Sequence, residues 1–331
     1  MIEGFTDGPL FGLPLVELWF GLLLFVLGMF LVLDGFDFGI GALFLARDDH
    51  EEKETLLAVI GPFWDGNEVW LVVFGGVLFA VFPAAYAGLF SRNYLLMFAI
   101  LGALILRGLA PEFYEQREDA AWQRAWGLAF GVGSVAAPFL LGMFVANWML
   151  GATGIVTVAG VVVGLAVVAL SVADGVAFLG MKTRTPLRRE AVPYGIGGIA
   201  AYLGLVVAAL GYLYLTRPDL QAALLSPVTL GVVAVSVVLA GVYVVFLRDG
   251  HYLLAFVAVA GVTFALVAFV GALLYPMVDP AADLSVADAA VSTLPLNIMT
   301  VFGTLLIPLV LTYFAVVYSV FSGPIEAGET Y

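Results

Sequence analysis

The sequence of 331 residues contains no cysteine, which excludes a disulfide framework, a thiolate metal site and a catalytic cysteine. Charged residues are also scarce: they make up 11% of the chain, and only two of them are lysines. No stretch is long and polar enough for a separate soluble domain, and no basic tract suits a nucleic-acid backbone. We therefore expect no nucleic-acid partner and no globular catalytic domain.

Histidine is almost as rare, and this limits the cofactors that the chain can hold. His50 lies in a charged loop, and His251 lies beside Arg248 and Asp249 at the start of an apolar segment. Haem iron in a membrane cytochrome usually has at least one histidine ligand, and no histidine lies inside an apolar segment here. The sequence also lacks a phosphate-binding glycine loop, a zinc motif and a Ser-His-Asp set. We predict that the chain binds no haem and no metal, and that it is not catalytic alone.

Hydrophobic residues, in contrast, make up 63% of the chain. They form nine apolar segments of about 20 residues or more, the length that an α-helix needs to cross a bilayer. This pattern predicts an all-α polytopic membrane protein with nine transmembrane helices in a single membrane domain, residues 1–331. The nine segments are 12–46, 55–82, 86–110, 122–149, 154–181, 191–216, 227–247, 251–275 and 295–321.

The basic residues predict how these helices are oriented. Nine spans place the two termini on opposite sides of the membrane, and cytoplasmic loops are enriched in Lys and Arg. By this reading ten of the twelve basic residues follow the first, third, fifth and seventh segments, and only Arg92 and Arg217 lie on the other side. The N-terminus is therefore predicted to be outside and the C-terminus cytoplasmic. The ten residues are Arg47, Lys53, Arg107, Arg117, Arg124, Lys182, Arg184, Arg188, Arg189 and Arg248.

A short internal echo suggests a repeat. The first segment contains Asp-Gly-Phe-Asp-Phe at residues 34–38, and the fifth contains Asp-Gly-Val-Ala-Phe at residues 174–178. Both lie near the predicted cytoplasmic end of a span that starts outside. They favour two parallel four-helix bundles, 12–149 and 154–275, with 295–321 as a peripheral ninth helix. A chance match is the alternative, because the chain has 38 glycines.

Six carboxylates lie within the apolar segments, where a charge is costly and usually functional. Two pairs have a spacing of three residues, Asp34 with Asp37 and Asp65 with Glu68, so each pair shares a helix face. Asp65 lies 12 residues past Lys53, or roughly 18 Å along a helix. A row of buried carboxyl groups reaching inward from the cytoplasm suits a path for proton uptake. The alternative is structural, with each carboxylate bonded to a neighbouring helix. The other two are Glu17, for which we favour the structural role, and Asp174.

The second segment contains an unusual polar motif, Gly-Pro-Phe-Trp-Asp-Gly-Asn-Glu-Val-Trp, at residues 61–70. Pro62 removes a backbone hydrogen bond and bends a helix. Asn67 could satisfy the backbone groups that this bend frees. We expect either a simple kink or an opening beside Asp65 that admits water or a small molecule.

With these residues the chain resembles subunit II of the cytochrome bd-type quinol oxidases. The similar stretches are DGFDFG at 34–39, GPFWDGNEVWL at 61–71 and GGVLFA at 75–80 followed by Phe-Pro at 82–83. Arg107, Tyr275-Pro276 and LNIMT at 296–300 also match, so the resemblance extends over essentially the whole chain.

The resemblance implies a terminal respiratory oxidase in a prokaryotic plasma membrane, which oxidises quinol and reduces oxygen to water. Haems b and d are then in subunit I, the partner. Small single-span subunits, membrane lipid and a structural quinone are further partners of this kind of complex. Carried over to this sequence, the resemblance implies a cytoplasmic proton path through Asp65, Asp34, Asp37 and Glu68. It implies an oxygen route or a partner interface at Trp64, Trp70 and Asn67.

Two other functions remain open from the residues alone. A proton-coupled secondary transporter could use the same carboxylates, but broken helices usually occur in both halves of a transporter. Here the second segment has Pro62 and Gly66, whereas the sixth has only Pro193 near its start. A structural scaffold would use the carboxylates only to join helices.

Overall fold

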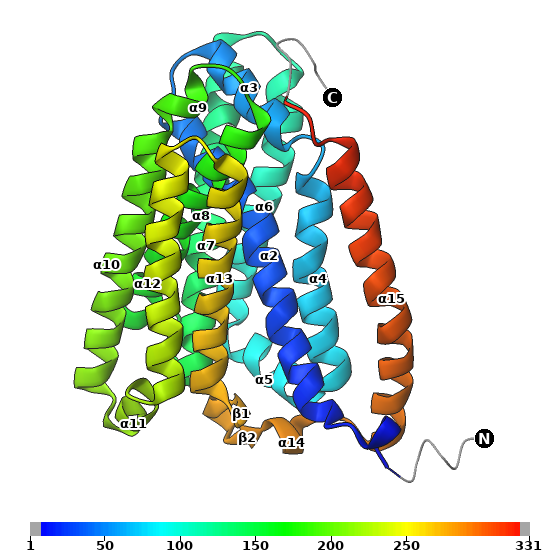
Figure 1. The fold of residues 1–331 in the computed structure, drawn as a ribbon. Coiled ribbons are helices and arrows are strands. Elements are labelled where there is room, and N and C mark those ends of the chain that lie inside the picture. Colours follow the sequence, from blue (N-terminus) through cyan, green and yellow to red (C-terminus); the bar gives the residue numbers. More distant parts are fainter. Residues whose placement is uncertain (1–7, 325–331) are drawn as a thin grey trace.

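The computed structural model describes residues 8–324, and in this range nine helices are long and apolar enough to cross a membrane. The predicted all-α polytopic fold with nine spans is confirmed for this part of the chain (Figure 1). The spanning helices are α2 (Leu15–Leu45), α4 (Trp64–Val81), α6 (Tyr94–Glu115), α7 (Ala120–Leu150), α8 (Val158–Lys182), α10 (Val192–Thr216), α12 (Pro227–Arg248), α13 (Tyr252–Leu274) and α15 (Thr293–Val320).

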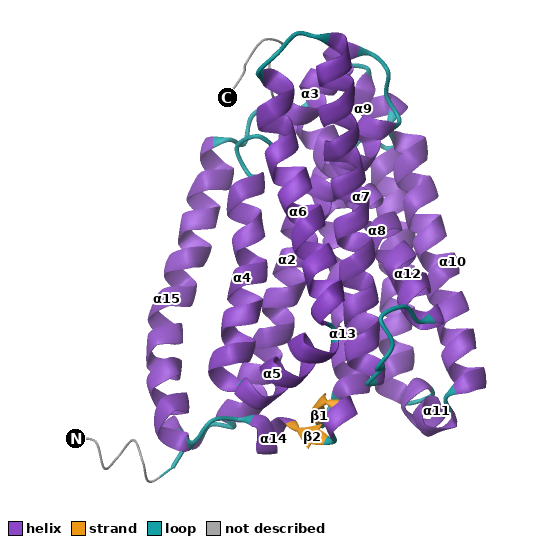
Figure 2. Ribbon diagram, turned by 180° about the vertical axis from the view of Figure 1, so that it is seen from behind, coloured by secondary structure: helices purple, strands orange, loops and turns teal. Residues whose placement is uncertain are grey.

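Short elements close the two ends of the bundle (Figures 1 and 2). One end carries α3 (His50–Ile60) and α9 (Leu187–Glu190). Near the opposite end are η1 (Leu10–Gly12), α5 (Pro83–Arg92), η2 (Pro218–Leu220), α11 (Gln221–Leu224), β1 (Met277–Asp279), η3 (Pro280–Ala282), β2 (Leu284–Ser285) and α14 (Val286–Ala289). Strands β1 and β2 pair antiparallel.

Two predicted spans have different bounds in the structure. Segment 55–82 is broken, because α3 ends at Ile60 and α4 begins at Trp64. Pro62 lies in this break, where its missing N–H costs no helical hydrogen bond. The predicted segment 86–110 includes part of α5, which is a separate helix that ends at Arg92. The segment also stops short of the end of α6, which runs through Pro111 to Glu115. Apolar content alone did not separate α5 from α6.

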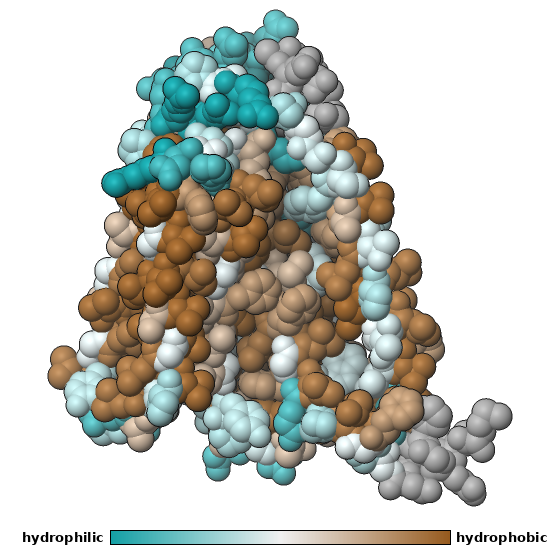
Figure 3. Space-filling model, viewed as in Figure 1, coloured by the Kyte–Doolittle hydropathy of each residue, from teal (hydrophilic) through white to brown (hydrophobic). Residues whose placement is uncertain are grey.

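This shift corrects the position of Arg107. Its place near the end of segment 86–110 assigns it to the connection that follows, but it lies inside α6 and is 1% exposed. Nine of the twelve basic residues remain in or beside the connections at the end that carries α3 and α9. Figure 3 shows hydrophilic residues gathered at this same end. The orientation of the bundle in the cell stays a prediction.

The two similar stretches, residues 34–38 of α2 and 174–178 of α8, belong to helices that pack directly against each other. A Cβ atom on Gly39 would lie 1.9 Å from the carbonyl oxygen of Ser171, and one on Gly175 would lie 2.7 Å from the carbonyl carbon of Gly39. Only glycine permits helices to approach this closely. Beside this crossing, the rings of Phe36 and Phe178 stack with centroids 3.7 Å apart. The crossing of α2 and α8 therefore lies in the core, while the division into two four-helix bundles stays a prediction.

Helix α15 lies at the edge of the bundle, beside α4 (Figures 1 and 2). Leu296 and Asn297 are its buried residues. Its contacts with the rest of the chain include ring contacts and side-chain hydrogen bonds. Trp19 of α2 donates a hydrogen bond to Thr300, and Phe314 packs against Trp70 of α4 at 5.4 Å between ring centroids.

The α2–α8 crossing gives a first prediction. We expect Gly39→Ala to destabilise the protein by about 1–3 kcal/mol or more, because the added methyl group collides with backbone that cannot rotate away. The measurement is the midpoint of thermal unfolding in a mild detergent. Gly21→Ala is the matched control, since it is in the same helix and a Cβ atom there meets nothing within 4 Å. Equal midpoints for the two variants would contradict this view of the crossing.

Candidate functional site

The most unusual polar group in the core is the guanidinium of Arg107. Its Nη2 atom donates to Asp34 Oδ1 at 2.8 Å and to Glu68 Oε1 at 2.6 Å. Its guanidinium carbon, Cζ, also lies 4.8 Å from the ring centroid of Phe38. One cation therefore joins three helices, because Asp34 is on α2, Glu68 is on α4 and Arg107 is on α6.

Asn67 connects a second layer of this cluster. Its Nδ2 atom donates to Asp37 Oδ2 and to the backbone oxygen of Leu33, both at 2.9 Å. Its Oδ1 atom accepts a hydrogen bond of 2.9 Å from the hydroxyl of Tyr318. The amide is fully buried and ties α2 and α4 to the peripheral helix α15. We refer to Asp34, Asp37, Asn67, Glu68, Arg107 and Tyr318 as the charge cluster.

The local sequence explains how α4 supplies two of these groups. The break at Gly61–Phe63 starts α4 at Trp64, so Asn67 and Glu68 fall in its first two turns. Asn67 then faces α2, and Glu68 reaches toward α6. On α2 the spacing of three residues between Asp34 and Asp37 puts both carboxyl groups on the side that meets α4 and α6. Asp34 and Asp37 thus share a helix face, as predicted. On α4 the predicted pair is Asp65 with Glu68, but the residues that face the interior are Asn67 and Glu68.

The charges of the cluster do not balance when all its carboxyl groups are ionised. Three carboxylates, Asp34, Asp37 and Glu68, face one guanidinium. Asp34 and Asp37 are fully buried, and an uncompensated ion in such a place costs several kcal/mol. Asp34 Oδ2, Asp37 Oδ1 and two nitrogens of Arg107 also have no hydrogen-bond partner among the described residues. A group of this kind is suited to taking up and releasing protons.

Asp65 lies outside the cluster. It is in the first turn of α4, where the helix dipole favours a negative charge, and its side chain is exposed on the surface of the chain. It makes no hydrogen bond or ion pair with another residue of the described range. The exposed residues that follow it on the same face of α4 are Val69 and Val72.

The two tryptophans of the motif pack in different ways. Trp70 is buried, with its ring 6.4 Å from that of Phe25 and 5.4 Å from that of Phe314. Trp64 is half-buried and lies against α6, where a Cβ atom on Gly108 would come within 3.2 Å of its ring. Their predicted role in an oxygen route or partner interface stays a prediction.

Asp174 is a further buried carboxyl group. It is 1% exposed, and neither of its oxygens has a hydrogen-bond partner among the described residues. It lies against α2, since a Cβ atom on Gly35 would be 3.1 Å from Asp174 Oδ2. The sixth carboxylate, Glu17, is exposed near the opposite end of α2.

Sequence reasoning missed two members of the cluster. Arg107 could have been found, because its neighbours on both sides are apolar and the rule that selected the carboxylates applies equally to arginine. Tyr318 carries no such signal, since tyrosine is common in membrane helices, at interfaces above all.

The two histidines of the chain lie away from the charge cluster. His50 opens α3 and pairs with Glu54 at 3.1 Å, and His251 directly precedes α13. Both lie at helix ends. Among the described residues, no three His, Asp or Glu side chains converge as the ligands of a metal ion would.

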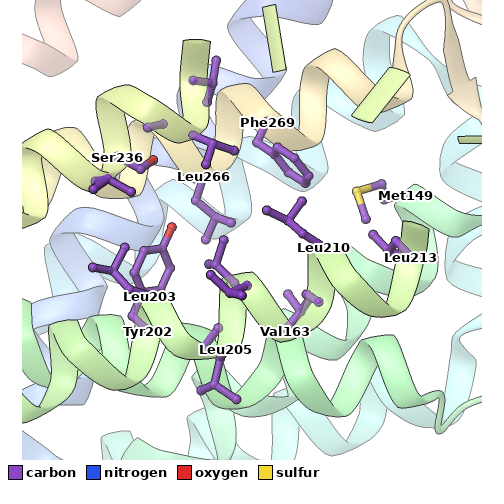
Figure 4. A pocket seen from close by; sticks show the side chains of 18 residues that line it. Met149, Val163, Tyr202, Leu203, Leu205, Leu210, Leu213, Ser236, Leu266 and Phe269 are labelled. Carbon is purple, nitrogen blue, oxygen red and sulfur yellow. The ribbon is translucent and has the colours of Figure 1, made fainter. Parts of the chain in front are cut away.

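A separate apolar cavity of about 290 Å³ lies between α8, α10, α12 and α13. Figure 4 shows its lining, which is hydrocarbon except for the thioether sulfur of Met149 and the hydroxyl groups of Tyr202 and Ser236. Tyr202 is 2% exposed. Its lining residues are distinct from those of the charge cluster.

A sequence model of the family described as cytochrome bd terminal oxidase subunit II matches residues 15–321. The chain belongs to this family. Subunit 2 of the cytochrome bd-I ubiquinol oxidase of Escherichia coli (strain K12) is 29% identical over 355 residues, which cover 91% of this chain and 92% of the relative. Subunit 2 of the cytochrome bd ubiquinol oxidase of Bacillus subtilis (strain 168) is 29% identical over 317 residues, covering 89% and 92%.

The fold is also that of a solved structure. A chain in the bd oxidase from Geobacillus thermodenitrificans superposes with a TM-score of 0.77 at 17% sequence identity, covering 92% of this chain and 98% of that one. The predicted resemblance to subunit II is confirmed by the family match. None of the relatives named here is a carrier, and the transporter alternative has no support from them.

The cluster predicts a strong dependence of stability on Arg107. Arg107→Gln leaves Asp34 and Glu68 without their cation, and we expect a loss of about 3–5 kcal/mol, as for a broken buried ion pair. Equilibrium unfolding in mixed detergent measures it. Adding Asp34→Asn to this variant should recover part of the lost stability, because one buried carboxylate without a cation is removed.

The control is Arg217→Gln, which breaks the exposed ion pair of Arg217 with Asp219. This change should cost less than about 1 kcal/mol. Similar small losses for Arg107→Gln and Arg217→Gln would show that the buried pair does not hold the three helices together.

Proposed function

We propose that the chain acts as the non-haem subunit II of a bd-type quinol:oxygen oxidoreductase, a terminal respiratory oxidase. The family match over residues 15–321 carries this proposal, and the relatives from two bacteria are subunits of ubiquinol oxidases. A haem-bearing subunit I is the implied partner, with haems b and d. This assignment agrees with the absence of histidine from the membrane-spanning helices of the described range.

The surface of α4 and α6 supports a partner at this position. Exposed apolar side chains follow one stripe on each helix, Val69 and Val72 on α4 and Ile105 and Leu109 on α6. Asp65 lies on the same stripe of α4, where lipid would leave a carboxylate without a partner. We infer that subunit I covers this stripe and supplies polar contacts to Asp65.

The proton path is the second part of the proposal. The carboxyl groups pass from the surface to the interior: Asp65 is exposed, the side chain of Glu68 is 29% accessible, and those of Asp34 and Asp37 are fully buried. We propose that protons from the cytoplasm reach the partner interface through Asp65 and Glu68, and that Asp34 and Asp37 hold protons behind them. The unbalanced charges around Arg107 are the observation that supports this role.

The apolar cavity suits a long hydrocarbon chain. We propose that it holds the tail of a structural quinone or of a lipid, with Tyr202 and Ser236 as the two groups that can form hydrogen bonds. Trp64, Trp70 and Asn67 remain candidates for the oxygen route or for the partner interface, and small single-span subunits are further candidate partners.

A purification tests the assignment as an oxidase subunit. The tagged chain, isolated from its native membranes in mild detergent, should bring a haem-bearing partner and show haem bands in a reduced-minus-oxidised spectrum. These bands should disappear when the partner is stripped away. A spectrum without haem, together with no second membrane subunit, would contradict the assignment.

The proton path is tested by Asp65→Asn in the assembled oxidase. We expect normal haem content but slower quinol-driven oxygen reduction, by on the order of 100-fold if Asp65 transfers protons directly. Proton uptake in proteoliposomes should fall in parallel. Glu17→Gln is the matched control, because it removes a carboxylate from a membrane helix away from the cluster. Unchanged turnover and uptake in assembled Asp65→Asn would remove Asp65 from the path.

A further inference from the structure

A basic pocket lies where the end of α2, α3, the end of α6 and the start of α7 meet. Its volume is about 480 Å³, and it is open on one side. Arg47, Lys53 and Arg124 line it, and Asp48 is the only acidic residue in its wall within residues 8–324. Three of the twelve basic residues of a chain with a net charge of −13 thus share one pocket.

Two of the three basic residues of this pocket have no ion-pair partner among the described residues. Lys53 and Arg124 form no ion pair with any described residue, and Lys53 lies 5.2 Å from the ring centroid of Phe44. Arg47 uses its Nη1 atom for Glu190 at 3.2 Å and Glu52 at 3.7 Å. The Nε and Nη2 atoms of Arg47 are buried and have no partner among the described residues. The unpaired side chains of Lys53 and Arg124 suit an anion with several oxygens.

Another titratable group of the pocket is already engaged. His50 pairs with Glu54 at 3.1 Å, and its second ring nitrogen lies 3.4 Å from the hydroxyl of Tyr114. The open positions therefore belong to the basic side chains of the pocket rather than to His50.

The pocket is polar at the end of the bundle and apolar toward the membrane. Leu45 precedes Arg47 at the end of α2, and Leu128 lies one turn deeper along α7 than Arg124. Both leucines line the pocket and are exposed, at 43% and 57%. A free phosphate ion would use only the polar part, whereas a phospholipid would use both. The gradient favours the lipid.

We propose that this pocket binds an anionic phospholipid, with its phosphate group held by Arg47, Lys53 and Arg124. An acyl chain then runs over Leu45 and Leu128 into the bilayer. Basic pockets between transmembrane helices bind anionic headgroups in this way at the cytoplasmic surface. The site involves no residue of the charge cluster, and it does not depend on the oxidase function proposed above.

Native mass spectrometry of the complex purified from its own membranes tests the proposal. The wild type should retain an anionic phospholipid that Lys53→Gln/Arg124→Gln loses. Its affinity for added phosphatidylglycerol should fall about thirtyfold in this double variant, because each cation at a membrane surface contributes about fivefold. Lys53→Arg/Arg124→Lys keeps both charges and should retain the lipid.

The control is Arg184→Gln/Arg248→Gln, which removes two charges at the same end of the bundle but outside the pocket. It should bind as the wild type does. Thermal stabilisation by phosphatidylglycerol is then compared with that by phosphatidylcholine and by inorganic phosphate. Equal stabilisation by inorganic phosphate would show that the pocket binds a free anion and not a lipid, and would overturn the proposal. Equal lipid retention in all variants, or no anionic lipid on the wild type, would overturn the proposal.

Discussion

The structure depends on one arginine in the membrane interior. Arg107 joins carboxylates of α2 and α4 to α6, and all three helices converge on it. An arginine alone in hydrocarbon is costly, and so is each carboxylate, so none of the three side chains is stable there without the others. The same arrangement leaves more acidic than basic groups in the cluster. In this account, stability and the proposed proton binding therefore have a common origin in these residues.

Two backbone features bring these side chains together. The break at Gly61–Phe63 sets where α4 begins, and so which of its residues face α2 and α6. The close crossing of α2 and α8 at Gly39 and Gly175 fixes α2 in the core. Helix α15 adds Tyr318 from the edge of the bundle. Glycine and proline thus place the cluster, although neither carries its chemistry.

The sequence predicted the number and type of the helices, because long apolar runs have few other solutions in a membrane. It also singled out Asp34, Asp37, Asn67 and Glu68, which the structure brings together, since polar residues stand out against such runs. It did not predict that Asp65 faces outward while Asn67 faces inward, because this depends on where α4 begins within an unbroken apolar segment. Nor did it place Arg107, whose span was shifted by the merging of α5 with α6. Contacts with α15 depend on tertiary packing, which no local pattern encodes.

The central claim is that the carboxyl groups around Arg107 bind and release protons during turnover. Infrared difference spectroscopy of the assembled oxidase, between its oxidised and reduced states, observes the carbonyl stretch of protonated carboxyl groups directly. We predict a change in this band that is lost in Asp37→Asn and kept in Glu17→Gln. A spectrum without any carboxyl change, or one that Asp37→Asn leaves unaltered while haem content is normal, would contradict the account.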